Sequence, residues 1–133
     1  MSPNDVELVR VYTKETGGKI SDSTLPVSSG FEVIVEAEAG SAIHSSGAQF
    51  LTNILVRDLS ANDLIPATPT QASSGAMSSS AWPELYRAFQ YKVNTANLTG
   101  RENHVCQVIS FLNAGMTNPD VSFAVSPLFI MTK

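Results

Sequence analysis

The residues that could carry chemistry are few, since the chain has two histidines and one cysteine. His104 and Cys106 are separated by one residue, so on a strand their side chains share a face, roughly 7 Å apart. That separation exceeds the hydrogen-bond reach that a nucleophilic Cys–His pair needs. A metal could bridge them with His44 as a third ligand, but no known ligand spacing is present. We therefore predict no metal, no cofactor and a small buried thiol beside a histidine at a strand end.

Three carboxylates alternate with apolar residues within Phe31–Glu38: Glu32, Glu36 and Glu38. Paired carboxylates can perform acid–base catalysis or hold Ca²⁺, but the sequence has no calcium-loop, P-loop, GxSxG, HExxH or GxGxxG motif. A charged outer face is the ordinary condition of a half-buried strand. The sequence thus argues against an enzyme. The alternative that stays open is a small metal-dependent or hydrolytic enzyme using His44, His104 and acidic neighbours.

A neutral segment at 64–83 is the most unusual stretch, with no charged residue over 20 positions and three prolines. Loops this long within a compact domain are uncommon and are often functional. We predict a loop with firm ends and a mobile centre at 71–80, because apolar residues are sparse there. Trp82 and Tyr86, with Met77 nearby, are the predicted contact residues for a protein or carbohydrate partner. The competing interpretation is that Trp82 closes the end of the fold.

The elements that must position these residues are strands. Apolar residues alternate with polar ones, or occupy both faces, in six segments: 6–13, 31–38, 49–58, 84–93, 104–112 and 121–131. The segments 49–58 and 104–112 are apolar on both faces, so we expect central strands covered at least in part on both sides. Pro127 cannot donate to a ladder and predicts an edge or a bulge. A bulge would place Phe123, Val125, Leu128 and Ile130 on one face.

Six or seven strands without a helix predict an all-β fold, an antiparallel two-sheet β-sandwich. The spacing favours an immunoglobulin-like arrangement, with a jelly roll as the alternative. The Cys–Trp–Cys signature of true immunoglobulin domains is absent. A length of 133 residues fits a single domain over 1–133 that includes the neutral loop.

Charge and hydropathy exclude several partners. The net charge is −4 and no basic cluster is present, so we expect neither nucleic acid nor a membrane surface as a partner. The sequence has no signal peptide and no apolar run long enough to span a bilayer, which makes the cytoplasm the default compartment. The favoured function is a non-catalytic binding or assembly module. Strand 121–131 is apolar on both sides, which predicts a homodimer or contact with another protein.

Overall fold

The computed structural model describes residues 3–115 and 120–133 of the chain. Strands dominate the described residues, with one short α-helix and one 3₁₀ turn. In chain order the elements are β1 (Val6–Glu15), β2 (Thr24–Pro26), β3 (Phe31–Ala39), α1 (Ser41–Ser45), β4 (Gln49–Asp58), β5 (Asp63–Ile65), β6 (Thr68–Pro69), β7 (Ser74–Ala76), β8 (Tyr86–Val93), η1 (Thr95–Asn97), β9 (Val105–Ala114), β10 (Asp120–Val125) and β11 (Phe129–Thr132).

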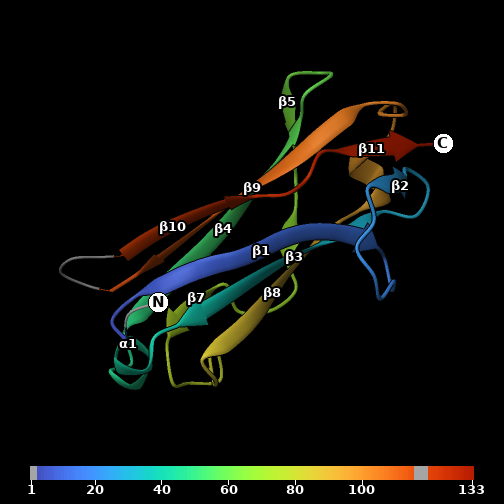
Figure 1. Cartoon of the computed structure of the whole chain (residues 1–133). Helices are drawn as coiled ribbons and strands as arrows, with labels where there is room; N and C mark the ends of the chain where they lie inside the picture. The colour runs from blue at the N-terminus through green and yellow to red at the C-terminus, as the bar shows by residue number, and fades with distance from the viewer. Residues whose placement is uncertain (1–2, 116–119) are drawn as a thin grey trace.

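The strands form two sheets that pack face to face (Figure 1). The first sheet has the order β1-β3-β8-β6, and the second has the order β2-β11-β9-β4-β5, with β10 paired to β9 and β7 to β4. This matches the immunoglobulin arrangement, in which strands A, B, E and D face strands C, F and G. The predicted two-sheet sandwich is confirmed. One pair, β2 with β11, is parallel and was not expected.

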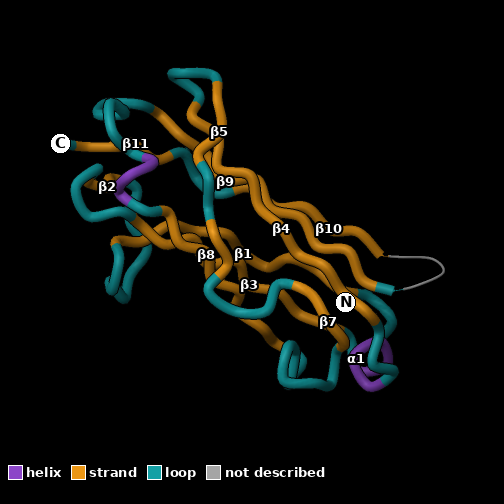
Figure 2. The backbone as a smooth tube through the Cα atoms, turned by 180° about the vertical axis from the view of Figure 1, so that it is seen from behind, coloured by secondary structure: helices purple, strands orange, loops and turns teal. Residues whose placement is uncertain are grey.

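The core lies between the two layers, which Figure 2 shows from behind with α1 at one end and β2 and β11 at the other. Burial alternates strictly along β4, as the period-2 pattern requires. In β3 the predicted alternation is incomplete, because Glu32 and Ile34 on the outer face are also buried. β3 is a central strand between β1 and β8, so side chains of both neighbours cover its outer face.

The last strand is interrupted at Pro127, and the register shows why. Val125 lies opposite Ile109, whereas Phe129 lies opposite Cys106. Four residues on this strand therefore match three on β9, so one residue is extra. The predicted bulge is confirmed, and it does leave Phe123, Leu128 and Ile130 all exposed.

The neutral segment at 64–83 differs from the loop expected there, since it contains most of β5 and all of β6 and β7. Its centre is also hydrogen-bonded: the Thr52 amide donates to the Ser73 carbonyl, and the Met77 amide donates to the Ala48 carbonyl. Propensity missed these strands because each is two or three residues long and is formed by pairing with β4 or β8. The mobility of 71–80 stays a prediction.

Candidate functional site

The outer face of the second sheet carries a largely apolar surface built from three neighbouring strands, with Asn53 and Asn113 as its polar positions. The register aligns three rows across β4, β9 and β10. The rows are Leu55–Ile109–Val125, Asn53–Phe111–Phe123 and Leu51–Asn113–Val121. The seven apolar members of these rows, together with Leu64 on β5, are called the apolar face below.

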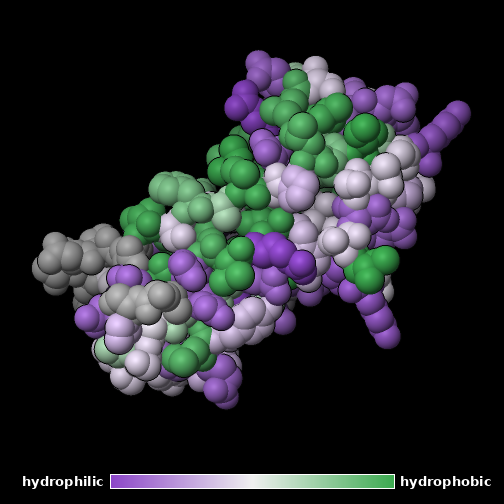
Figure 3. Space-filling view, viewed as in Figure 1, coloured by the Kyte–Doolittle hydropathy of each residue, from purple (hydrophilic) through white to green (hydrophobic). Residues whose placement is uncertain are grey.

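Most side chains of the apolar face are open to solvent. Phe123 is 71% exposed and Val125 is 58% exposed, and Leu51, Leu55, Leu64 and Val121 are also exposed. Phe111 is partly covered, and its ring centre lies 6.4 Å from that of Phe123. In Figure 3 hydrophobic side chains form a band over β10 and β9 towards β5. Isolated exposed apolar residues are normal, whereas a contiguous patch indicates a contact site.

The apolar face is nearly free of charge. Along the described outward positions of β4, β9 and β10, Arg57 is the single charged side chain, and its Nη2 donates to Asn62 Oδ1 at 3.1 Å. Beside Arg57, where β5 folds against β4, lies a hollow of about 240 Å³ that Leu55, Leu64 and Ile109 help to line. The face can therefore bury apolar surface, but it offers no ionic recognition beyond this one corner.

The outer face of the first sheet is polar, and it contains the predicted acidic stripe. Arg10 Nε lies 2.9 Å from Glu36 Oε2, and the Tyr86 hydroxyl donates to Glu36 Oε1 at 2.7 Å. Partial burial and the nearby Glu36 carboxylate raise the pKa of Tyr86 to about 12. Lys14 Nζ lies 3.1 Å from Glu32 Oε1. Because Glu32 and Glu36 are each paired with a cation, they do not form the pair of free carboxylates that acid–base catalysis requires.

The structure separates the predicted contact residues. Trp82 is 0% exposed and Met77 is 1% exposed, so in this conformation a partner does not reach either side chain. The Trp82 ring packs edge-on against Phe50 at 5.0 Å and Phe89 at 5.4 Å. Trp82 therefore fills the core, as the competing interpretation held. Tyr86 is on the surface, and a contact site in this region stays a prediction that depends on Tyr86 alone.

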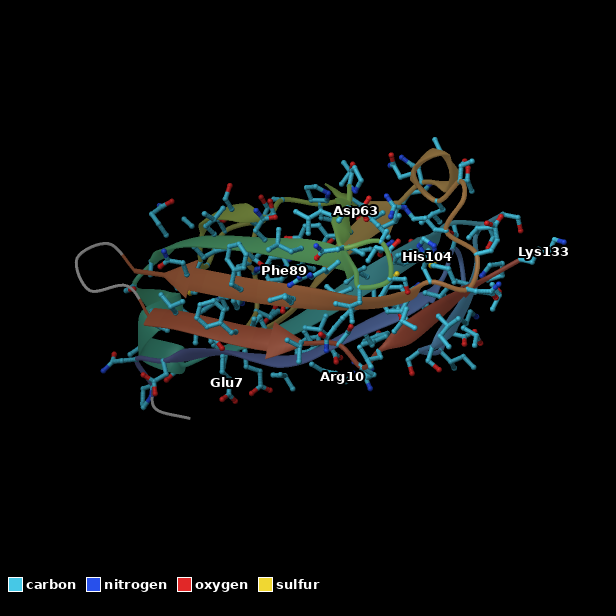
Figure 4. All side chains as sticks on the ribbon, turned by 90° about the horizontal axis from the view of Figure 1, so that it is seen from above. Glu7, Arg10, Asp63, Phe89, His104 and Lys133 are labelled. Atoms are coloured by element: carbon cyan, nitrogen blue, oxygen red, sulfur yellow. The ribbon has the colours of Figure 1, made fainter. Side chains whose placement is uncertain are left out.

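The two histidines lie at opposite ends of the sandwich. His44 is buried in α1, where its Nε2 lies 2.8 Å from the Trp82 carbonyl and its Nδ1 lies 3.1 Å from the Ser78 hydroxyl. Since a carbonyl oxygen only accepts, Nε2 donates to the Trp82 carbonyl, and the Ser78 hydroxyl donates to the His44 carbonyl at 2.6 Å. His104 lies at the end of the molecule that carries Lys133 (Figure 4). The described residues contain no cluster of three or more His, Cys, Asp or Glu side chains that could hold a metal ion.

A charged cluster around Asp58 was missed at the sequence level. Arg101 Nη1 lies 2.7 Å from Asp58 Oδ2 and 2.8 Å from Asp63 Oδ1, and His104 Nδ1 lies 2.7 Å from Asp58 Oδ2. Burial raises the pKa of Asp58, but hydrogen bonds from His104, the Ala61 amide and Arg101 outweigh it, and the net effect lowers this pKa. The sequence pattern does not reveal this cluster, because Arg101 lies about forty positions along the chain from Asp58 and Asp63.

Cys106 lies opposite Asp58 in the β4–β9 register and is fully buried. Burial, with the nearby Asp58 carboxylate, raises the pKa of the Cys106 thiol to about 12. A thiol in this state is a poor nucleophile at neutral pH. The expected small buried thiol beside a histidine at a strand end agrees with this geometry.

Comparisons with known proteins give one structural likeness. No protein-family model matches the chain, and no curated protein matches it. The fold is similar to that of AggA, the major subunit of aggregative adherence fimbriae type I from Escherichia coli, with a TM-score of 0.50. The two chains share 8% identity, over 97% of this chain and 95% of AggA. At this identity the likeness shows the fold alone. None of the described helices is long and apolar enough to cross a membrane.

Proposed function

We propose that this chain is a non-catalytic assembly module that joins another polypeptide through the apolar face. The observation that carries the proposal is that β4 and β9 also carry large apolar side chains on the side that the sandwich leaves uncovered. Side chains such as Leu51 and Phe123 remain half or more exposed. Burying apolar area is favourable by roughly 25 cal/mol per Å², so a complex in which a partner covers these strands is stabilised relative to the isolated chain.

The likeness to a fimbrial major subunit supports the same role. A fimbria is built from protein subunits, so AggA places this kind of sandwich in a polypeptide that assembles with others. A fimbria also lies outside the cell. An assembly role of that kind would place this chain outside the cell, rather than in the cytoplasm that we expected by default from its sequence.

Two other functions have less support. Carbohydrate contact through 64–83 was predicted with Trp82 and Met77 as anchors, and both side chains lie in the core. The enzyme alternative needs His44 and His104 to act with acidic neighbours. His44 has both ring nitrogens engaged, and His104 is held at the opposite end of the sandwich by Asp58. The apolar face, in contrast, is already exposed and can bind a partner without a change in conformation.

A photo-crosslinking amino acid at position 123 tests the proposal in cells that express the chain. Phe123 is exposed, so the substitution should leave the fold intact. We expect irradiation to yield adducts of polypeptide mass. The matched control carries the same group at Lys92, which is exposed on the first sheet, and should yield none. Absence of adducts from position 123, or equal yields from both positions, would refute the proposal.

A further inference from the structure

We infer that the partner that covers the apolar face is a second copy of this chain, packed face to face about a two-fold axis. The inference rests on the proposed function, since it uses the same face, and it adds the identity of the partner and the geometry. Three features of the face carry it: its charge, the central position of Phe111 and its size.

Charge favours a second copy over a charged partner. The chain carries a net charge of −4, yet the described outward positions of β4, β9 and β10 hold no carboxylate. Two copies packed on this face therefore bring no acidic groups together, and Arg57 at one corner is the single cation there. A strongly acidic or basic partner would find no line of counter-charges, and an anionic lipid surface would find one arginine.

The arrangement of rows places Phe111 at the centre. Phe111 lies on β9, between β4 and β10, and in the middle one of the three rows. In a face-to-face pair the two-fold axis lies in the plane between the sheets. An axis through the centre of the face, whether along the strands or across them, sets Phe111 opposite its own copy. Phe123 then faces either its own copy or Asn53 of the other chain.

The size of the face sets the expected strength. Three strands over the length of the rows cover roughly 20 by 15 Å, given a rise of about 3.4 Å per residue and a strand separation of about 4.8 Å. Two such outlines give roughly 600 Å² in total, so even with Leu64 and Ile130 added the contact is smaller than the about 1,200 Å² at the low end of the range for specific interfaces, and we expect a weak dimer. We expect a dissociation constant in the micromolar range, so the dimer should dissociate on dilution.

Sedimentation velocity on the purified chain, from about 1 to 500 µM, measures the association. The sharp test is a charge exchange at Phe111. Phe111→Asp and Phe111→Lys each place like charges opposite one another, so each variant alone should associate at least tenfold more weakly than the wild type. An equal mixture of the two should restore a mixed dimer, because Asp then faces Lys. Only a partner that is itself a copy of the chain predicts this rescue.

Controls separate association from folding. Glu38→Lys changes charge on the outer face of the first sheet and should dimerise as the wild type does. Circular dichroism verifies that each Phe111 variant is folded. Phe123→Asp, at a side chain that is 71% exposed, repeats the loss of association where folding does not depend on the ring.

Three outcomes would overturn the inference. They are a wild-type chain that stays monomeric at about 500 µM, folded Phe111 and Phe123 variants that dimerise like the wild type, and a mixture of the Phe111 variants that stays monomeric. Adducts of another mass from position 123, with a monomeric purified chain, would refute the second copy and leave the proposed function standing. Absence of any adduct would refute the proposed function itself.

Discussion

The outer faces of the two sheets are formed by the same strand alternation, but one is covered with ion-paired side chains and the other with exposed apolar side chains. On the first sheet, Glu32 and Glu36 are paired with Lys14 and Arg10. On the second, Phe111 and Phe123 stand in a row with no charge beside them. One face satisfies its groups within the chain, and the other leaves apolar area to water. This difference is the basis of our proposal that a partner covers the second sheet and not the first.

Exposure of a side chain does not by itself identify a contact residue. Tyr86 on the first sheet and Leu51 on the second are exposed to nearly the same extent. The Tyr86 hydroxyl already donates to Glu36, whereas Leu51 belongs to a row that continues to Val121. Covering a residue of a contiguous apolar surface with a partner contributes favourable binding free energy. Covering a residue whose polar group is already hydrogen-bonded contributes little.

Trp82→Ala should produce the largest effect, because Trp82 lies between the faces in the shared core. Removing a fully buried indole is expected to lower the free energy of unfolding by about 3–5 kcal/mol. Urea denaturation measures this loss. A loss below about 1 kcal/mol would contradict the packing of Trp82 against Phe50 and Phe89.

Glu32→Ala and Leu55→Ser compare the two faces directly. Glu32 accepts from the Gly17 amide, Lys14 and Gln90, so its removal leaves partly buried donors unpaired and should cost about 1–3 kcal/mol of folding free energy. Leu55 is exposed, and its replacement should change folding by no more than about 0.5 kcal/mol. The effect on association should be the reverse: Leu55→Ser should dimerise more weakly than the wild type, and Glu32→Ala should dimerise as strongly as the wild type. Equal effects of both variants on folding and on association would remove the distinction between the faces.

Acidification should affect folding and association differently. Burial raises the pKa of Glu32, but Lys14 and the Gly17 amide outweigh it, and the net pKa is lowered, as it is for Asp58. The stability from these carboxylates is fully present above the unfolded-state pKa near 4, and it is lost as pH falls through the lowered folded-state values. Unfolding free energy should therefore decline below about pH 4.5. Association through a face without carboxylates should keep one dissociation constant between about pH 6 and 8.

Glu32→Gln is the control for that pH dependence, since it removes one titrating group and keeps the shape. Urea denaturation between about pH 3 and 7 should show a shallower acid slope for the variant than for the wild type. An identical slope would mean that Glu32 does not contribute.

Tyr86→Phe should produce the smallest effect. The change removes one hydrogen bond to Glu36 at a half-exposed position, so unfolding free energy should change by about 0.5 kcal/mol or less. Sedimentation should be unchanged, because Tyr86 lies on the first sheet. A clear loss of association in this variant would instead support the contact site that the sequence predicted around Tyr86.

Part of the structure followed from local pattern. The alternation in 31–38 and 49–58 gave the strands, and Pro127 gave the bulge that sets Phe123 and Leu128 on one side. These features depend on side-chain direction along a single strand, which the sequence contains. The expectation that 49–58 is covered at least in part on both sides is wrong, because the outward residues of β4 are all exposed.

The short strands β6 and β7 and the cluster of Asp58 with Arg101 could not be predicted in the same way. Each depends on partners far along the chain: Gln49–Leu51 pairs with Ser74–Ala76, and Arg101 reaches across to Asp58. Trp82 was likewise predicted to be a surface contact residue. It lies in the core because its ring packs against Phe50 and Phe89.

By itself, then, the sequence determined a sandwich of alternating strands, the bulge at Pro127 and the absence of a recognisable catalytic motif. The tertiary structure decided which apolar positions are buried and which remain in water. The physical reason is that alternation fixes two faces for every strand, whereas only the packing of one sheet on another selects the face that is covered. For β4 and β9 that selection leaves Leu55, Phe111 and their neighbours outside.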